Sequence, residues 1–512
     1  MSEQLALLPG YLTAHLQLAL VALLVGAAVS IPLGIWVTGR PRAERAALAI
    51  ASIIQTIPSL ALLAMMVPAL AALGALTVRL FGLELTSIGY LPAIIGLTLY
   101  SVLPMLRNTV TGIAGVDPAL VEAARGVGMT NRQRLRLVQL PLALPVIVAG
   151  IRTATVWVVG IATLSTPVGA ASLGNYIFTG LQTRNFTAVL VGCVAAAALA
   201  LLLDGLVHML EIGAQQRRRS LIATALALLG GLYAYTGVTL AADWLDRGQP
   251  RVTIGAKTFT EQYILSELMA FQIERTTGLA TEVVQSLGST VAFDALRGGA
   301  LDVYVDYSGT IWATIMERDS VPDDPSAVLA EVGDYLAREH GITMVGALGF
   351  ENTYALAMRD NHAERLQLSS ISALAPHAGS FVVAGDYEFF GRPEWRGLQE
   401  TYGLDFAEQR SMDSSLMYQA VAGRQVDVIS AFSTDGRIAA LDLRVLTDDR
   451  GAIPPYDAII LASRRLVDEA PQAVQALAAL VDTIDAATMR RLNGAVDQDG
   501  QSPQAVARGF LE

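Results

Sequence analysis

Long apolar runs fill the first half of the chain, whereas short apolar runs alternate with polar stretches in the second half. Six runs of the first half are long enough to cross a bilayer as helices, because about 20 apolar residues span its hydrocarbon core. They cover 13–38, 47–73, 88–106, 142–165, 187–211 and 221–242. The pattern predicts an all-α polytopic membrane portion of about six spans.

From Val252 onward the apolar runs shorten to strand length. VTIGA (252–256), EVVQSL and VYVDY are typical of strands, and 260–276 is typical of a helix. This alternation predicts an α/β fold with largely parallel sheets. The length of the region is natural for two lobes.

An internal repeat supports the two lobes. SLGSTVAFDALRGGALDVYVDYS (286–308) aligns with SMDSSLMYQAVAGRQVDVISAFS (411–433) at a shift of 125 residues. Each copy has a hydroxyl pair, a helix, a glycine, a strand, an aromatic residue and a serine. Ligands of open α/β sheets bind near helix N-termini and the carboxyl ends of strands, so these hydroxyls and aromatics are expected to face one cleft. The plainer interpretation is a shared pattern of caps and core residues. The lobes are predicted as 251–349 with 441–512, and as 350–440.

The longest polar stretch of the membrane half is DPALVEAARGVGMTNRQRLRLVQLP, residues 117–141, hereafter the coupling loop. Asp117 is expected to cap a first short helix, and Gly126 and Gly128 to break the chain. Thr130 then caps a second helix, and the glutamine three residues later completes a capping box. The stretch therefore predicts a basic helix–break–helix between the third and fourth spans.

Arginines near the ends of the runs predict the orientation of the helices. They are Arg40, Arg42 and Arg45 after the first run, Arg107 with the coupling-loop arginines after the third, and Arg217, Arg218 and Arg219 after the fifth. The positive-inside rule puts all of them in the cytoplasm, so the N-terminus and the second half are expected outside. MSEQLALLPG has no basic region, and a cleaved signal peptide is not expected.

Charge separates the two halves. Residues 1–244 carry 14 basic and 8 acidic side chains, whereas 245–512 carry 21 basic and 38 acidic ones. An acidic soluble half argues against nucleic acid and mildly favours cationic ligands. Cys193 is the single cysteine and the five histidines are scattered, so no disulfide within the chain, metal site or cofactor is expected.

The coupling loop resembles the EAA loop of ABC importer permeases. The matching residues, which the resemblance implies contact a separate cytoplasmic ATPase, are Glu122, Ala123, Ala124, Gly128, Leu140 and Pro141. The chain itself has no P-loop, because its only lysine, Lys257, follows an alanine where that motif needs glycine. The permease portion, 1–212, is similar to osmoprotectant importers for glycine betaine, carnitine and choline, including TIPSLALLA. Residues 213–250 would then be an extra span and linker.

Residues 251–512 resemble the substrate-binding proteins of the same importers, which implies a two-lobed α/β fold like that of periplasmic binding proteins. The resemblance lies in GAKTFTEQYIL, DVYVDYSGT, FENTYALAM, FSTDGRIAALDL and IPPYDA. It implies an aromatic cage for a trimethylammonium group, formed by Tyr307, Tyr354, Phe432 and Tyr456. Phe432 stands where related proteins often have tyrosine, so the ring is kept without its hydroxyl. Polar candidates by the same route are Thr258, Thr260, Ser289, Thr290 and Asn352.

Two further candidates lie in the loop GDYEFFGR. Phe389 adds a ring, and Arg392 could bind a carboxylate through its planar fork. A lone aromatic residue is more often a packing residue, and Arg392 could equally form a surface or interlobe salt bridge.

The resulting hypothesis is a non-enzymatic membrane subunit of an ABC importer that combines permease and tethered receptor. It would take up a quaternary-ammonium osmoprotectant, or another trimethylammonium zwitterion such as ergothioneine, which some fused members import. Two copies in the lipid bilayer of the inner membrane would assemble with two ATPases, with the binding domain outside. A membrane-anchored sensor is disfavoured because no output domain is present, and an extracytoplasmic enzyme because no nucleophile elbow appears. Residues 166–185 are too polar to span and have no assigned role.

Overall fold

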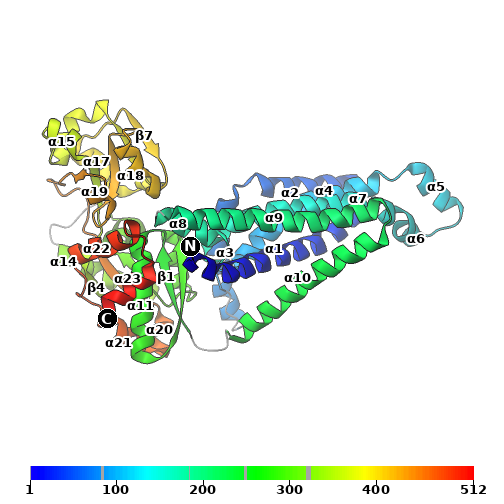
Figure 1. The fold of residues 1–512 in the computed structure, drawn as a ribbon, viewed down its shortest axis with the longest axis horizontal. Coiled ribbons are helices and arrows are strands. Elements are labelled where there is room, and N and C mark those ends of the chain that lie inside the picture. The colour runs from blue at the N-terminus through cyan, green and yellow to red at the C-terminus, as the bar shows by residue number, and fades with distance from the viewer. Residues whose placement is uncertain (1, 82–85, 184, 247–250, 319–324) are drawn as a thin grey trace. The chain divides into compact units, whose positions relative to one another are not determined.

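The computed structural model describes residues 2–81, 86–183, 185–246, 251–318 and 325–512. The chain forms two compact units, a helical one of Met1–Phe178 and Thr187–Gln249 and an α/β one of Thr179–Phe186 and Pro250–Glu512. The division falls near residue 250, where the apolar pattern changes from long runs to short ones (Figure 1).

Long apolar helices make up the first unit (Figure 1). They are α1 (Ser2–Val37), α2 (Pro41–Thr56), α3 (Ser59–Phe81), α4 (Tyr90–Ala114), α7 (Leu140–Ala162), α9 (Phe186–Gln215) and α10 (Arg219–Asp246). Among the described residues, α1, α4, α7 with the turns around it, α9 and α10 are each long and apolar enough to cross a membrane. Five of the six predicted runs are thereby confirmed as helices of spanning length.

The second predicted run, 47–73, is not one straight helix. The helix breaks between Thr56 and Ser59, and the two segments meet at 99°. Pro58 lacks the N–H that would continue the helix, and it forces Ile57 into an extended conformation with ψ of 129°. The run is a bent pair, α2 with α3, which counts as a span only if the pair crosses together.

Small residues allow close helix packing around α4. A Cβ added at Gly26 would lie 1.9 Å from Ser101 Oγ, and one added at Gly150 would lie 2.9 Å from the Pro104 carbonyl oxygen. α4 therefore packs against α1 on one side and α7 on the other, as small residues at membrane helix interfaces permit.

The extra span α10 is joined to α1 by polar contacts. Thr13 Oγ1 lies 2.7 Å from Tyr235 Oη, and Gln17 Nε2 donates to Asp243 Oδ2 at 2.9 Å. Interhelical hydrogen bonds of this kind stabilise membrane helix pairs by about 1 kcal/mol each. α10 is therefore packed on α1 and is more than a loose tether.

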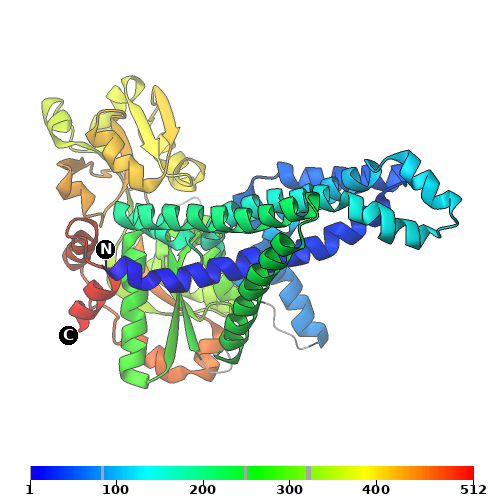
Figure 2. The ribbon, with the colours of Figure 1, turned by 45° about the vertical axis from the view of Figure 1, so that its right-hand side comes forward.

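Two five-stranded sheets form the α/β unit. The first has the order β2-β1-β3-β10-β4 and the second β7-β6-β8-β5-β9. The strands are β1 (Arg251–Lys257), β2 (Ala280–Leu287), β3 (Val303–Tyr307), β4 (Thr343–Glu351), β5 (Tyr354–Arg359), β6 (Val382–Gly385), β7 (Glu408–Ser411), β8 (Val428–Phe432), β9 (Leu443–Val445) and β10 (Asp457–Ala462). The second sheet and its helices, yellow and orange in Figures 1 and 2, form a separate lobe.

The two sheets have the same topology, which confirms the two lobes inferred from the repeat. β1 runs parallel to β2 and β3, as β6 does to β7 and β8, while β10 and β5 run antiparallel to both of their neighbours. The expectation of largely parallel sheets is thus wrong, because β4 passes into β5 through two residues and β5 enters its sheet from the junction between the lobes. β9 belongs to the second sheet and Thr447 pairs with Ser370, so the chain is still in that lobe at residue 447, beyond the predicted boundary at 440.

Helices cover the faces of both sheets. They are α11 (Thr260–Thr277), α12 (Ser289–Arg297), α13 (Ser308–Thr310), α14 (Pro325–Tyr335), α15 (Asp360–Arg365), α16 (Ile371–Leu374), α17 (Pro393–Tyr402), α18 (Ser414–Ala422), α19 (Arg437–Ala440), α20 (Arg464–Glu469), α21 (Pro471–Ala478), α22 (Ala486–Asp497) and α23 (Pro503–Leu511). α11 lies between the first sheet and α21, α22 and α23, and every residue from Thr260 to Ala270 is buried.

Candidate functional site

Aromatic side chains of both sheets meet where their strands end. Tyr307 is the last residue of β3, and Phe432 is the last residue of β8. Tyr354 begins β5 and pairs with Phe432 in the ladder. Tyr456 precedes β10, whose Ala458 pairs with Tyr307. Because β3 and β8 hold equivalent places, the two copies of the repeat bring their rings to one junction.

The rings form a continuous chain across this junction. The Phe432 ring centroid lies 5.1 Å from that of Tyr354 and 5.8 Å from that of Phe259. Phe259 lies 6.1 Å from Tyr307, and Tyr354 lies 6.0 Å from Tyr456 with its ring edge-on. The structure thus brings the four predicted cage residues together through Phe259, which the sequence analysis did not single out.

Glycines allow two of the rings to approach the backbone closely. A Cβ at Gly309 would lie 2.5 Å from the Tyr456 ring, and one at Gly385 would lie 2.8 Å from the Phe389 ring. Phe389 in turn lies 5.2 Å from Tyr354. Only glycine leaves this space. Phe259, Tyr307, Tyr354, Phe389, Phe432 and Tyr456 are hereafter the aromatic cluster.

A buried guanidinium and a buried carboxylate border the aromatic cluster. Arg392 is 8% exposed, and its Cζ lies 5.3 Å from the centre of the Tyr354 ring. Its Nη2 donates to Glu388 Oε2 at 3.0 Å, and its Nη1 lies 3.6 Å from Glu394 Oε1. Glu394 also accepts a hydrogen bond from the Tyr456 hydroxyl. Arg392 therefore forms ion pairs within its own lobe instead of an interlobe salt bridge, and it also places a cation over a ring.

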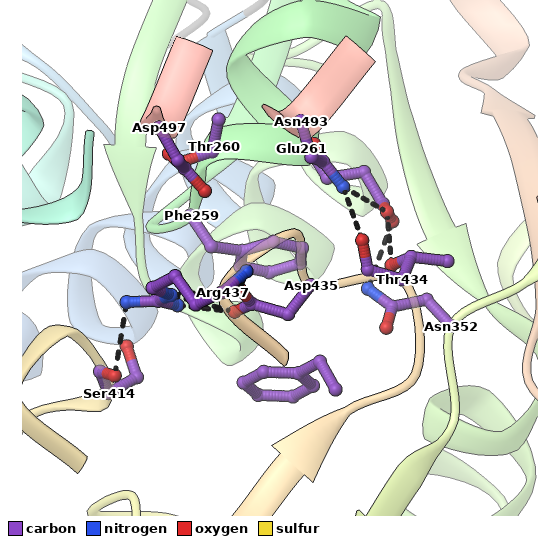
Figure 3. Close-up of a pocket in the computed structure, with 11 residues that line it drawn as sticks. Phe259, Thr260, Glu261, Asn352, Ser414, Thr434, Asp435, Arg437, Asn493 and Asp497 are labelled. Atoms are coloured by element: carbon purple, nitrogen blue, oxygen red, sulfur yellow. Dashed lines mark hydrogen bonds and ion pairs between the residues drawn. The ribbon is translucent and has the colours of Figure 1, made fainter. Parts of the chain in front are cut away.

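A cavity of about 20 Å³ lies beside Phe259 and Phe432 (Figure 3). Its lining residues are Phe259, Thr260, Glu261, Asn352, Ser414, Phe432, Thr434, Asp435, Arg437, Asn493 and Asp497. Of the predicted polar residues, Thr260 and Asn352 lie here, whereas Thr258, Ser289 and Thr290 are not among the lining residues. The volume holds about one water molecule, so a larger ligand requires the lobes to separate.

Glu261 is the hydrogen-bonding centre of this cavity (Figure 3). Its Oε1 accepts from Tyr307 Oη at 2.6 Å and from Asn352 Nδ2 at 2.9 Å. Its Oε2 accepts from Thr434 Oγ1 at 2.6 Å and from Asn493 Nδ2 at 3.3 Å. Burial raises the pKa of Glu261, and these four donors oppose the rise. Four donors match an ionised carboxylate, which only accepts.

The contacts of Glu261 also connect the two lobes. Glu261 and Asn493 belong to the first lobe, whereas Thr434 follows β8 of the second. Asn493 Nδ2 donates in addition to the Thr434 carbonyl at 3.0 Å. The Glu261 carboxylate therefore connects the two lobes beside the aromatic cluster.

Arg437, the one cation among the described residues that line the cavity, is already paired. Arg437 Nε donates to Asp435 Oδ1 at 2.8 Å, and the guanidinium lies 4.0 Å from the Tyr418 ring. Thr260 Oγ1 donates to Asp497 Oδ1 at 2.7 Å. Three carboxylates against one guanidinium, beside the half-buried rings of Phe259 and Phe432, suit a cationic ligand better than an anionic one.

The sequence signal for the missed residues was weak. Phe259 and Glu261 lie in GAKTFTEQYIL, and the family resemblance in that stretch drew attention to the threonines. A glutamate on a helix that is buried all round could have indicated a bonded carboxylate, because such residues are buried only when paired. Among the described residues, no group of three or more histidine, cysteine, aspartate or glutamate side chains is placed to hold a metal.

The coupling loop has the predicted helix–break–helix structure. Asp117 Oδ1 accepts from the Ala119 amide at 2.9 Å and caps α5 (Pro118–Gly126). Thr130 and Gln133 form the capping box of α6 (Asn131–Arg134). Gly128 has φ of +81° between the two helices. The local prediction is therefore confirmed in each of these details.

The predicted docking residues lie on both sides of this break. Glu122 and Ala123 are exposed on α5, whereas Ala124 is buried. From α6 the helix continues through a π-helical turn (Leu135–Gln139) into α7, which begins with Leu140 and Pro141. α5 and α6 lie together at one end of the helical unit (Figure 1). A force on α6 would therefore pass directly to the α7 span.

Two family models cover most of the chain. Residues 250–512 match the substrate-binding domain of the ABC-type glycine betaine transport system. Residues 30–216 match the inner-membrane component of binding-protein-dependent transport systems. The two matches fall on the α/β and helical units respectively.

Curated relatives resemble the whole chain or one half of it. An ergothioneine transport permease/ergothioneine-binding protein of Helicobacter pylori (strain G27) is 29% identical over 94% of this chain and 85% of its own length. A glycine betaine/carnitine/choline transport permease of Bacillus subtilis (strain 168) is 40% identical over 37% of this chain and 80% of its own. A glycine-betaine-binding protein of Pseudomonas aeruginosa is 36% identical over 50% of this chain and 86% of its own.

Proposed function

Because the chain belongs to the ABC importer family that handles glycine betaine and related solutes, with an inner-membrane permease fused to a substrate-binding domain, we propose that it takes up a quaternary-ammonium osmoprotectant. Glycine betaine, choline and carnitine are the candidate solutes. The protein is an integral inner-membrane transport subunit, and the family implies a cytoplasmic ATPase partner and a small solute ligand.

The observation that carries the proposal is the aromatic cluster, which both lobes contribute to and which adjoins a buried carboxylate. Tyr307 and Phe259 come from the first lobe, and Tyr354 and Phe432 from the second. A trimethylammonium group has no hydrogen-bond donor, so π faces and negative charge are the means of binding it. Each desolvated ring contributes about 1–2 kcal/mol, and Glu261 adds a negative charge.

Arg392 supplies the complementary group for a ligand carboxylate. Its guanidinium is buried between the rings and Glu394, and its Nη1 already reaches across to Thr314 Oγ1 of the first lobe at 3.3 Å. A planar guanidinium binds carboxylates through two parallel hydrogen bonds. A zwitterion would thereby place its cation on the rings and its carboxylate on Arg392, and closure of the lobes would enclose both.

The permease half would transmit ATP-driven closure through the coupling loop. We place Glu122 and Ala123 of α5, with the break at Gly128, against a separate ATPase subunit in the cytoplasm. Two copies of the chain, each with one ATPase, would form the translocation pathway between their helical units. The α/β unit would then lie on the extracytoplasmic side, where it captures the solute.

A second candidate solute is ergothioneine. The ergothioneine transport permease/ergothioneine-binding protein of Helicobacter pylori shares the fused arrangement over 94% of this chain. Ergothioneine also carries a trimethylammonium group and a carboxylate, so the same cluster suits it. The two candidates differ in the imidazole ring, which glycine betaine lacks.

Calorimetry on the full chain in lipid nanodiscs tests the proposal. Glycine betaine, choline, carnitine, proline betaine and ergothioneine are titrated separately, and at least one is expected to bind saturably. Phe432→Leu should weaken that binding by about tenfold, because it removes one π face. Phe432→Tyr should not. Phe381→Leu, in the core of the second lobe, is the matched control. Failure of every trimethylammonium compound to bind would overturn the proposal.

A further inference from the structure

Two polar atoms beside the aromatic cluster are buried without a partner among the described residues. Glu394 Oε1 accepts from the Tyr456 hydroxyl, but Glu394 Oε2 has no hydrogen-bond partner. Arg392 likewise uses both terminal nitrogens, whereas its Nε is unpaired. Glu394 is 2% exposed and Arg392 is 8% exposed. A buried charged atom without a partner is costly.

The position of Glu394 places it at the same site. It lies in the first turn of α17, two residues after Arg392, and its carboxylate touches the hydroxyl of Tyr456. Tyr456 packs edge-on against Tyr354, over which Arg392 lies. Glu394, Arg392, Tyr354 and Tyr456 therefore surround one point between the lobes. A ligand that contacts the Tyr456 hydroxyl would come within reach of the carboxylate.

Glu394 is not required as the counter-charge of Arg392. Glu388 already pairs with Arg392 at 3.0 Å, whereas the Arg392–Glu394 separation is 3.6 Å. The side chain of Glu388 is 52% exposed, but that of Glu394 is fully buried. The unpaired oxygen of this second, desolvated carboxylate therefore has no evident role in the fold alone.

We propose that Glu394 is a specificity residue that accepts a hydrogen bond from an N–H or O–H group of the solute. The proposal rests on the proposed function, and it narrows the substrate class. The preferred solute would be a quaternary-ammonium zwitterion that also carries a hydrogen-bond donor. Glycine betaine has no such donor and would leave Glu394 Oε2 unpaired in the complex.

The expected discrimination is large because the acceptor is charged and buried. Sites built to accept a ligand donor reject the analogue that lacks it more strongly than apolar pockets reject a missing methylene group. A hydrogen bond to a charged group corresponds to about 10- to 100-fold in affinity. Solutes with the donor are therefore expected to bind more tightly than glycine betaine by a factor in this range.

Matched ligand pairs test this in the full chain in nanodiscs. Carnitine is compared with γ-butyrobetaine, which lacks its hydroxyl, and ergothioneine with an analogue methylated on the ring nitrogens. At least one donor-bearing member should bind about 10- to 100-fold more tightly than its partner. Glu394→Gln turns the free oxygen into an amide donor. It should reduce the affinity ratio between the two members of that pair to about threefold or less.

Two controls separate hydrogen bonding from charge and folding. Glu388→Gln removes a carboxylate from Arg392 without removing a buried acceptor, and it should leave the ratio within each pair unchanged. Glu394→Asp keeps the charge but shortens the side chain, and it should lower the ratio while retaining glycine betaine binding. Each variant's transition in calorimetry shows whether the α/β unit is folded.

Three outcomes are distinguishable. A ratio that falls in Glu394→Gln but not in Glu388→Gln supports the inference. Equal weakening of both members of every pair, or binding of glycine betaine without any donor-bearing solute, overturns the inference and leaves the proposed function intact. Loss of all trimethylammonium binding by the unmodified chain overturns the proposed function itself.

Discussion

At the scale of single residues, α11 concentrates buried carboxylates in the first lobe. Glu261 is held by four donors that connect the lobes. Glu267, six residues later, is 6% exposed and accepts from the Gln504 and Gln285 amides at 3.2 and 3.4 Å. Burial raises the pKa of Glu267 to about 7, and the charge of Glu274 adds to the rise. Two neutral amides offset less of the desolvation cost than a counter-ion would.

Glu267 makes the stability of the α/β unit depend on pH. Its folded pKa of about 7 exceeds the ordinary value of 4.5, so the folded state binds the proton more tightly. The free energy of unfolding therefore falls as pH rises from about 4.5 to about 7, and levels off above. Glu267→Gln cannot ionise, and it should raise the melting temperature at pH 8 by about 5 °C while changing it little at pH 5.

The measurement is scanning calorimetry of the full chain in nanodiscs, on the transition that ligand shifts upward. Glu364→Gln, which replaces an exposed carboxylate of the same unit, should keep the pH dependence of the unmodified chain. If the melting temperature of Glu267→Gln still fell between pH 5 and 7 as steeply as that of the unmodified chain, another group would be responsible for the pH dependence of stability.

At the scale of elements, structure set by neighbouring residues was predictable. The caps at Asp117 and Thr130 depend on atoms within three residues, and both are present as expected. The bend at Pro58 was missed because hydropathy reports how apolar a run is and not its direction. The antiparallel placement of β5 and β10 was missed because it follows from how the chain passes between lobes, which no short segment encodes.

In the candidate site, too, residues placed by local sequence pattern were predictable, whereas residues whose roles depend on distant contacts were not. The rings of Tyr307 and Phe432 were found because the repeat placed them at equivalent strand ends. Glu261 and Phe259 were missed because their roles come from groups far along the chain, such as Asn493 at 232 residues from Glu261. Arg392 was found as a candidate, but its neighbour Glu394 reaches Tyr456 only through tertiary packing.

The break in the coupling loop predicts a separation of binding from transport. Gly128 has φ of +81°, which a β-branched residue adopts only with strain. Gly128→Val should therefore destabilise the loop conformation that docks on the ATPase by about 1–2 kcal/mol. This cost corresponds to about a tenfold slower uptake. Binding of the solute to the full chain should be unchanged, because the substitution lies outside the α/β unit.

ATP-driven uptake into proteoliposomes, with the partner ATPase present, provides the measurement. Gly126→Ala is the matched control, since Gly126 ends α5 as a helical residue and a Cβ there would meet nothing within 4 Å. Equal uptake by Gly128→Val and the unmodified chain would remove the coupling role of the loop.

At the scale of the whole molecule, the number of crossings decides which parts share a side of the membrane. Three spans, α7, α9 and α10, separate the coupling loop from the α/β unit along the chain. If all three cross the membrane, their odd number would place the coupling loop and the α/β unit on opposite faces. Arg42 and the coupling loop are separated by the bent pair α2–α3 and by α4, so they share a face only if the pair crosses. The arginines on both sides favour a shared cytoplasmic face.

Cysteine labelling in spheroplasts decides whether the bent pair crosses. Cys193 is the only cysteine, so Cys193→Ser gives a background on which Arg42→Cys, Gly126→Cys and Asp499→Cys are made singly at exposed positions. An impermeant maleimide should label Asp499→Cys from outside, and should label the other two only after the membrane is opened. A pair that enters and leaves on one face would instead expose Arg42→Cys to the reagent while Gly126→Cys stays protected. In that case the bend at Pro58 would be the tip of a re-entrant hairpin. The orientation of α1 would then be reversed, and the first arginine cluster would contradict the positive-inside rule.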